Sequence, residues 1–219
     1  MGGLAYWVSQ IDSCNADALC VRERRIRISD SFFFESEFHK TSGFVHRLYR
    51  AAFGNTQPLP NPDLGDPNGP FYPGPDFHLK FPSYAVFSVD RSRLDATNLT
   101  ETQLALANEF VQRPEFVQEY PANLTKDEFI DQVLQTITAA SGSDLTSQKA
   151  TLSTIYDQGQ RGLVMFHLAN DYWDGCPGNQ APCVPQNVGP AVDNRAFIDA
   201  EYEMLFVMAE YVAYLRRDR

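Results

Sequence analysis

The chain has 219 residues, of which 43% are apolar and 13% aromatic, so it has enough apolar surface for a packed core and is not of the disordered class. Eighteen Lys and Arg residues stand against 28 Asp and Glu residues, and the formal net charge is −10. This negative field opposes binding to nucleic acid and to anionic membrane surfaces, and no stretch approaches the roughly 20 apolar residues of a membrane span. We therefore expect a globular protein without a nucleic-acid partner, membrane insertion or cofactor.

The first residues have no basic segment, no long apolar segment and no cleavage site, so they do not form a signal peptide. Apolar residues nevertheless recur at helical spacing from the start of the chain, as in the body of a helix whose beginning has been cut away. These residues are Leu4, Tyr6, Trp7, Val8 and Ile11. Together with the cysteines described next, this start indicates a segment of a longer exported protein.

Four cysteines form two close pairs, Cys14 with Cys20 and Cys176 with Cys183, and each pair encloses a short polar loop. The pattern favours two local disulfides, which imply an oxidising, extracellular or cell-surface location. Free thiols and a metal site are the alternatives. Zinc is the less favoured one, because both spacings exceed the usual two to four residues and no His lies near either pair in the sequence.

Residues 3–53 read as a helix, a Cys-clipped loop and two further helices. Apolar residues recur at helical spacing between Ile26 and Phe34 and between Phe44 and Ala52, which predicts buried helix faces. The same region contains a basic run of Arg22, Arg24, Arg25 and Arg27. This run is most simply a solvated helix face, with a ligand-binding patch as the alternative.

Residues 54–90 contain eight of the fourteen prolines, which remove backbone donors and prevent a sustained helix. Their aromatic side chains predict a long loop that packs against the rest of the protein. Because long ordered loops are disproportionately functional, we expect a binding surface here that includes Phe71, Tyr72 and Phe77.

Two helix starts follow. Leu99-Thr100-x-x-Gln103 and Leu124-Thr125-x-x-Glu128 each combine a capping box with a hydrophobic staple, and they predict helices near 100–113 and 125–140. Both segments also match the N-glycosylation sequon, at Asn98 and Asn123, but capping explains the Thr residues without a glycan.

Apolar spacing predicts further helices at about 145–158 and 160–173. A second Cys loop is expected at 175–190. The last helix, from about 193 to 217, has apolar residues widely spread around it and is expected to be central and largely buried. The fold class is thus all-α, with irregular helical units that carry long Pro-rich and Cys-clipped loop insertions.

Three passages of the chain are similar to one another. They begin near Phe44-Val45, Phe129-Ile130 and Phe197-Ile198, and motifs of the type Ser36-Glu37-Phe38 and Pro114-Glu115-Phe116 accompany them. This predicts one compact helical body over 1–219, made of degenerate repeat units at about 1–43 (partial), 44–122, 123–192 and 193–219 (partial). Aromatic residues are then expected to fill the interfaces between units; these are Tyr6, Trp7, Tyr49 and Trp173.

At these motifs, and at Gly3-Leu4-Ala5-Tyr6-Trp7, the chain resembles a bacterial family of extracellular helical repeats of unknown function, distantly like the linker domains of phycobilisomes. The second unit lacks a visible Gly-Leu-x-Tyr-Trp. The resemblance implies an all-α module of secreted or surface-layer-associated proteins that holds a cell-envelope glycan or a protein neighbour. The family offers no catalytic residues to carry over.

Signals for catalysis are weak. The four His residues form no recognised ligand set, and His46 and His167 are expected to be packing or solvent-facing residues. Asp171 and Asp174 flank Tyr172 and Trp173, so the carboxylates could act as acid and base in glycoside cleavage, or simply cap the helix end. Asp63 and Asp66 lie in an acidic loop that lacks the ligand pattern of an EF-hand.

The favoured hypothesis is a non-enzymatic extracellular or cell-surface module for assembly, adhesion or envelope-glycan binding. Its partners would be neighbouring domains, envelope proteins or a surface glycan. The candidate ligand-binding residues are Phe71, Tyr72, Phe77, Tyr172, Trp173 and Asp174. The alternative hypothesis is a carbohydrate-active hydrolase that uses Asp171 and Asp174.

Overall fold

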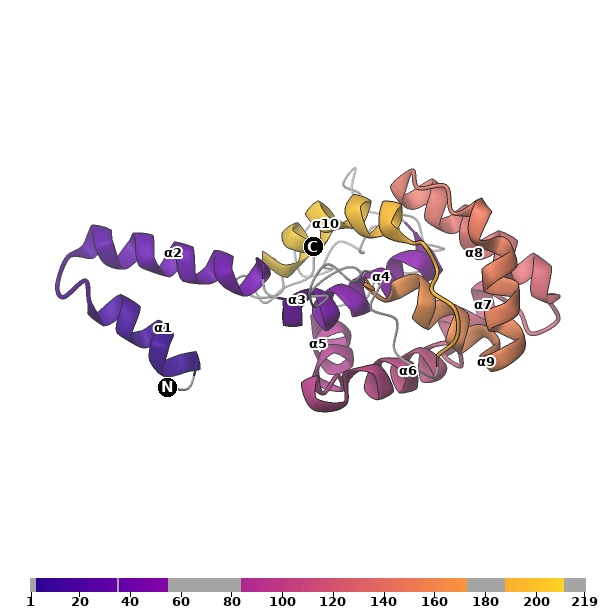
Figure 1. Ribbon diagram of the computed structural model, residues 1–219, viewed down its shortest axis with the longest axis horizontal. Coiled ribbons are helices and arrows are strands. Elements are labelled where there is room, and N and C mark those ends of the chain that lie inside the picture. Colours follow the sequence, from indigo (N-terminus) through magenta and orange to yellow (C-terminus); the bar gives the residue numbers. More distant parts are fainter. Residues whose placement is uncertain (1–2, 35, 55–83, 173–187, 211–219) are drawn as a thin grey trace, which may run out of the picture.

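The computed structural model describes residues 3–34, 36–54, 84–172 and 188–210, which form helices joined by short connections (Figure 1). No strand occurs among these residues, and the predicted all-α class is confirmed. The elements are α1 (Gly3–Asp12), α2 (Ala18–Phe34), α3 (Ser36–Lys40), α4 (Ser42–Phe53), α5 (Tyr84–Ser92), η2 (Ala96–Asn98), α6 (Leu99–Phe110), α7 (Pro114–Glu119), α8 (Lys126–Ser141), η3 (Thr146–Gln148), α9 (Lys149–Ala169) and α10 (Arg195–Glu210).

The first two helices form a hairpin that extends away from the other helices (Figure 1). We call this hairpin, α1 with α2, the arm, and helices α3 to α10 the body. One compact body was expected over the whole chain, and this stays a prediction; among the described residues the buried apolar core begins at Phe44, with Phe38 packed against it. The predicted division into repeat units stays a prediction.

Helix α4 lies at the centre of the body. It packs against α8, α9 and α10, and every residue from Ser42 to Phe53 is buried. The predicted face from Phe44 to Ala52 is therefore confirmed, but the opposite face is buried as well, including His46, Arg47 and Arg50. The expectation of a central last helix was wrong. Helix α10 buries Phe197 and Leu205 on one side and exposes the other side to solvent.

The two predicted capping boxes have different outcomes. At Thr125 the hydroxyl accepts from the Glu128 backbone N–H and the Glu128 carboxylate accepts from the Thr125 backbone N–H, as expected. At Thr100 the prediction was wrong, because the turn η2, capped by Asp95, leads directly into α6 one residue earlier. Gln103 is buried and its amide instead donates to the Lys40 carbonyl, 2.6 Å away.

The two helices predicted at 145–158 and 160–173 are the two halves of α9. Gly159 and Gln160 depart from helical geometry, with a φ of 55° and a ψ of −154° at Gln160, so the helix breaks where the sequence analysis placed a boundary. Residues 84–90 were expected in the loop and instead belong to α5 (Tyr84–Ser92), since the segment of α5 contains no proline.

Candidate functional site

Most of the predicted ligand-binding residues lie outside the described part of the chain. These are Phe71, Tyr72, Phe77, Trp173 and Asp174, together with Cys176, Cys183 and the acidic loop at Asp63 and Asp66.

Tyr172 is described, and it is buried rather than presented to a ligand. Only 1% of it is exposed, and its hydroxyl is hydrogen-bonded to Nδ1 of His167. The other ring nitrogen of His167 bonds to the Val188 carbonyl oxygen at 2.6 Å. Burial lowers the pKa of His167 to about 4, so the ring is neutral at pH 7 and serves to join α9 to the segment before α10. Asp171 is also buried, at 8% exposure.

The turn of the arm is held by a disulfide between Cys14 and Cys20, which confirms the first predicted pair. Asp17 strengthens the turn, because its carboxylate accepts from the backbone N–H groups of Leu19 and Cys20 at the start of α2. The two helices of the arm are thus tied together at their connection.

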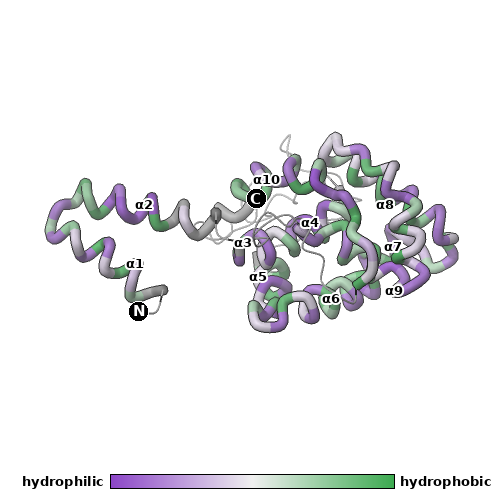
Figure 2. The backbone as a smooth tube through the Cα atoms, viewed as in Figure 1, coloured by the Kyte–Doolittle hydropathy of each residue, from purple (hydrophilic) through white to green (hydrophobic). Residues whose placement is uncertain are grey.

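The arm exposes apolar side chains on both helices. Figure 2 shows green, hydrophobic stretches of α1 and α2 in the part of the chain that lies away from the body. The exposed fractions are 49% for Tyr6, 46% for Val8, 72% for Leu19 and 51% for Ile26. The expectations that Ile26 lies on a buried face and that Tyr6 fills an interface within the chain were therefore wrong. An apolar spacing shows that a helix has an apolar face, but the face can meet a partner as well as the protein's own core.

A hollow of about 440 Å³ lies at the tip of the arm. Its apolar lining comes from Ala18, Val21 and Ile26, and Arg22 and Arg25 add two cations. Both arginines are exposed, so the predicted solvated face of α2 is confirmed for them. The lining of the hollow thus combines apolar side chains with two positive charges.

The outer face of α10 has the complementary character. Tyr202 and Val207 are 40% and 37% exposed, and the carboxylates of Asp199 and Glu203 are exposed beside them. Positions 199, 202, 203 and 207 recur at helical spacing and share one face. The segment Arg195–Glu210 contains four acidic residues and one Arg, whereas Ala18–Phe34 contains four Arg and two acidic residues.

The inner face of α10 is fixed by a buried ionic cluster. The Arg50 guanidinium donates to both carboxylate oxygens of Glu201, at 2.7 and 2.8 Å, and to the backbone carbonyls of Gly54 and Ala140. His46 bonds to the same carboxylate at 2.9 Å. Because Glu201 is only 1% exposed, this cluster sets the register of α10 on α4.

The cluster is charged at Arg50 and Glu201 and neutral at His46. Burial raises the pKa of Glu201, but the hydrogen bonds from His46 and Arg50 outweigh it and the pKa is lowered overall. Burial lowers the pKa of His46 more than Glu201 raises it. His46 therefore acts as a neutral hydrogen-bond donor. His46 and His167 were expected to be packing or solvent-facing residues, and both are buried.

A second buried cluster ties α5 to the body. Arg113 donates to both oxygens of Asp90, at 2.7 and 2.9 Å, and Tyr49 donates its hydroxyl to the same carboxylate at 3.0 Å. Burial raises the pKa of the Tyr49 hydroxyl, so it stays protonated. These groups satisfy one another and offer no open position for a substrate.

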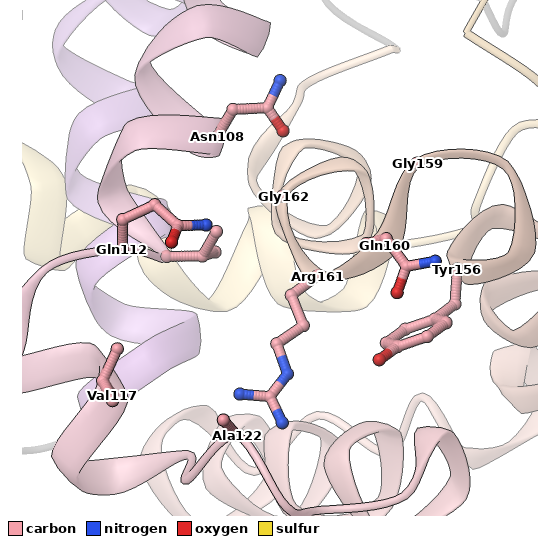
Figure 3. Close-up of a pocket in the computed structure, with 10 residues that line it drawn as sticks. Asn108, Gln112, Val117, Ala122, Tyr156, Gly159, Gln160, Arg161 and Gly162 are labelled. Atoms are coloured by element: carbon pink, nitrogen blue, oxygen red, sulfur yellow. The ribbon is translucent and has the colours of Figure 1, made fainter.

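One further hollow, of about 270 Å³, opens at the break in α9 (Figure 3). It is lined by Asn108, Val111, Gln112, Val117, Ala122, Tyr156, Gly159, Gln160, Arg161 and Gly162. The residues 159 and 160 were recognised from the sequence only as a helix boundary. No sequence signal connects Asn108 and Gln112 with them, because the crossing of α6 and α9 that brings them together is a tertiary feature.

Within the described ranges, no group of three or more His, Cys, Asp or Glu side chains is placed to hold a metal ion. The helices of these ranges also include none that is both long and apolar enough to cross a bilayer.

Comparisons with known proteins leave the resemblance to the helical-repeat family as a prediction. No family model, no curated protein and no solved structure matches this chain.

Proposed function

We propose that this protein is a non-enzymatic assembly module of the cell surface or extracellular space, in which the arm of one copy docks on α10 of the next copy. The observation that carries the proposal is the arm itself, a disulfide-clipped hairpin that projects from the body with exposed Tyr6, Val8, Leu19 and Ile26. Large apolar side chains exposed on a projecting element are typical of protein–protein interfaces. The disulfide is the support for an oxidising compartment.

Charge favours a second copy as the partner and α10 as the docking face. The chain up to residue 34 has four basic and four acidic residues, whereas the remainder has 14 basic and 24 acidic residues. Two bodies therefore repel each other, and the arm is the part that can approach another body closely. When the arm of one copy docks on α10 of the next, the positive charges of Arg22 and Arg25 lie opposite the carboxylates of Asp199 and Glu203.

Shape supports the same pairing. The hollow at the tip of the arm has an apolar lining, and α10 presents Tyr202, whose ring stacks on His39 of α3 and is still 40% exposed. A Tyr that enters an apolar hollow ringed by ion pairs is a common form of interface anchor. The two surfaces are different, so the contact is head-to-tail and produces an open chain of copies rather than a closed dimer.

Sedimentation velocity over a range of protein concentrations tests this function. The wild-type protein is expected to associate reversibly and weakly, because a helix pair of this size buries less than about 1,200 Å². The double variant Leu19→Glu, Ile26→Glu is expected to remain monomeric, and circular dichroism verifies that it stays helical. The control Val86→Glu, Val89→Glu places the same two charges on α5, at residues that are 43% and 59% exposed, and should associate like the wild type. A monomeric wild type at every concentration, or equal association of the double variant, would contradict the proposal.

A further inference from the structure

The hollow at the break in α9 is built from three separate parts of the chain. Asn108 and Gln112 come from the end of α6 and the turn after it, Ala122 comes from the segment before α8, and Tyr156, Gln160 and Arg161 flank the break itself (Figure 3). In the close-up, Arg161 extends between Gln112 on one side and Gln160 with Tyr156 on the other. Polar side chains from distant positions thus surround one space.

These side chains have hydrogen-bonding capacity that the protein does not use. In the described part of the chain, the side-chain amides of Asn108, Gln112 and Gln160 and the hydroxyl of Tyr156 make no hydrogen bond within the protein, and the three amide residues are exposed to solvent. An amide both donates and accepts, and a phenol does the same. Three amides and one phenol around a hollow therefore match a ligand that has many groups which both donate and accept, as hydroxyl groups do.

Two walls of the hollow are held in place. The Arg161 guanidinium donates to the carbonyl oxygens of Tyr120 and Pro121, at 2.5 and 2.8 Å, and lies over the Phe129 ring at 4.9 Å. On the other side α6 and α9 approach so closely that a Cβ at Gly162 would collide with Asn108. These two walls thus exist before any ligand enters, and the ordering needed on binding is that of the amide side chains.

The backbone at Gln160 gives a second, independent indication of a site. A φ of 55° with a ψ of −154° is a conformation that glycine adopts easily and side-chain-bearing residues do not. Gly159 stands directly beside it, yet the chain has Gln at the strained position. Non-glycine residues in such conformations concentrate at binding and active sites, where the strain holds a side chain in a required place.

We propose that this hollow binds a single neutral sugar unit, with Asn108, Gln112 and Gln160 bonding to its hydroxyl groups and Tyr156 contacting a face of its ring. The volume lies just below the about 300–1,000 Å³ usual for ligand sites, so it suits one sugar ring rather than a larger ligand. The lining contains no carboxylate to attract a cation. An anionic ligand is disfavoured because the chain carries a net charge of −10 and because Arg161, the cation of the lining, already donates to the carbonyl oxygens of Tyr120 and Pro121.

This site is separate from the arm and from α10, so it does not depend on the proposed assembly. The experiment is a titration followed by ¹H–¹⁵N NMR spectra, with methyl glucoside, methyl galactoside and N-acetylglucosamine as probes and glucuronate as the anionic comparison. Binding by one neutral sugar is expected at a Kd of about 1–10 mM. Shifts should be confined to the side-chain amides of Asn108, Gln112 and Gln160 and to the backbone of 159–162.

Two variants sharpen the test. Gln160→Ala is expected to weaken binding about tenfold, whereas Gln135→Ala, an exposed Gln of α8 outside the hollow, should leave it unchanged. Tyr156→Phe keeps the ring and should preserve part of the affinity. The proposal is overturned if none of the three neutral sugars shifts these signals, if glucuronate alone does so, or if both Gln variants bind equally.

Discussion

The arm and the body arrange the same kinds of residues in opposite ways. The body buries charged side chains such as Arg50 and Glu201 and satisfies them with one another, while its apolar residues close around α4. The arm exposes apolar residues such as Leu19 and Ile26 and places its arginines in solvent. The described part of the body therefore encloses an apolar core, whereas the arm has an apolar surface that a partner can cover. This difference can be tested at several points.

The largest effect is expected from the buried ionic cluster. Glu201→Gln removes the negative charge that compensates Arg50 and should lower the free energy of unfolding by about 3–5 kcal/mol. Urea unfolding followed by circular dichroism measures this loss. The neighbouring Glu203→Gln changes an exposed carboxylate on the same helix and should alter stability by less than about 0.5 kcal/mol. Equal effects of the two variants would show that the cluster does not stabilise the body.

The second largest effect is expected from acid, which should lower the free energy of unfolding of the body. His167 has a pKa of about 4 in the folded protein against 6.5 when unfolded, so the unfolded chain binds more protons between these values. The contribution of His167 is fully present above pH 6.5, falls as the pH is lowered, and reaches a loss of roughly 3 kcal/mol near pH 4.

Unfolding curves from pH 7 to pH 4 measure this dependence. The neutral variant His167→Gln should show a shallower decline over the same range than the wild type. His46, whose pKa is also lowered, adds to the decline in both proteins. A decline of equal steepness in the two proteins would remove His167 from the explanation.

Loss of the disulfide should affect the arm and leave the body unchanged. The double variant Cys14→Ser, Cys20→Ser is expected to destabilise the hairpin locally by about 2 kcal/mol, because the unfolded arm is no longer constrained. Hydrogen exchange resolves the two regions. Exchange should become faster in α1 and α2, with the protection of α4 unaltered. Faster exchange in α4 as well would mean that the arm and the body unfold together.

The smallest effect is expected at the break in α9, and its sign is opposite. Gln160→Gly relieves the backbone strain and should stabilise the protein by about 1 kcal/mol, which raises Tm by about 2–4 °C. Gln158→Gly, two residues earlier in helical conformation, should destabilise it by a similar amount. Thermal unfolding measures the Tm of both variants against that of the wild type. A Tm of Gln160→Gly below the wild-type value would show that the backbone at Gln160 is not strained.

Local features could be predicted well from the sequence. The Thr125–Glu128 capping box, the Cys14–Cys20 disulfide and the break near residue 159 all depend on residues close together in the chain. The apolar face of α4 was also recognised, because its period is that of a helix. Each of these features is decided by spacing and turn chemistry.

Tertiary features were missed for a common reason. The sequence does not show that the Gln103 side chain donates to the Lys40 carbonyl oxygen instead of capping its own helix. Nor does it show that Arg50 of α4 forms an ion pair with Glu201 of α10, 151 residues later. Apolar spacing in α2 correctly predicted a helix, but it gave no information on whether Ile26 faces a core or solvent. The candidate site in the arm therefore became visible only in the structure.

The most direct measurement is a mixing experiment with two variants that each lack one side of the proposed contact. Arg22→Glu, Arg25→Glu damages the arm and leaves α10 intact, while Tyr202→Ala, Glu203→Lys damages α10 and leaves the arm intact. Each variant alone should sediment as a monomer, and an equimolar mixture should form heterodimers, because one intact arm meets one intact α10. Association of either variant alone, or a mixture that remains monomeric, would contradict docking of the arm on α10.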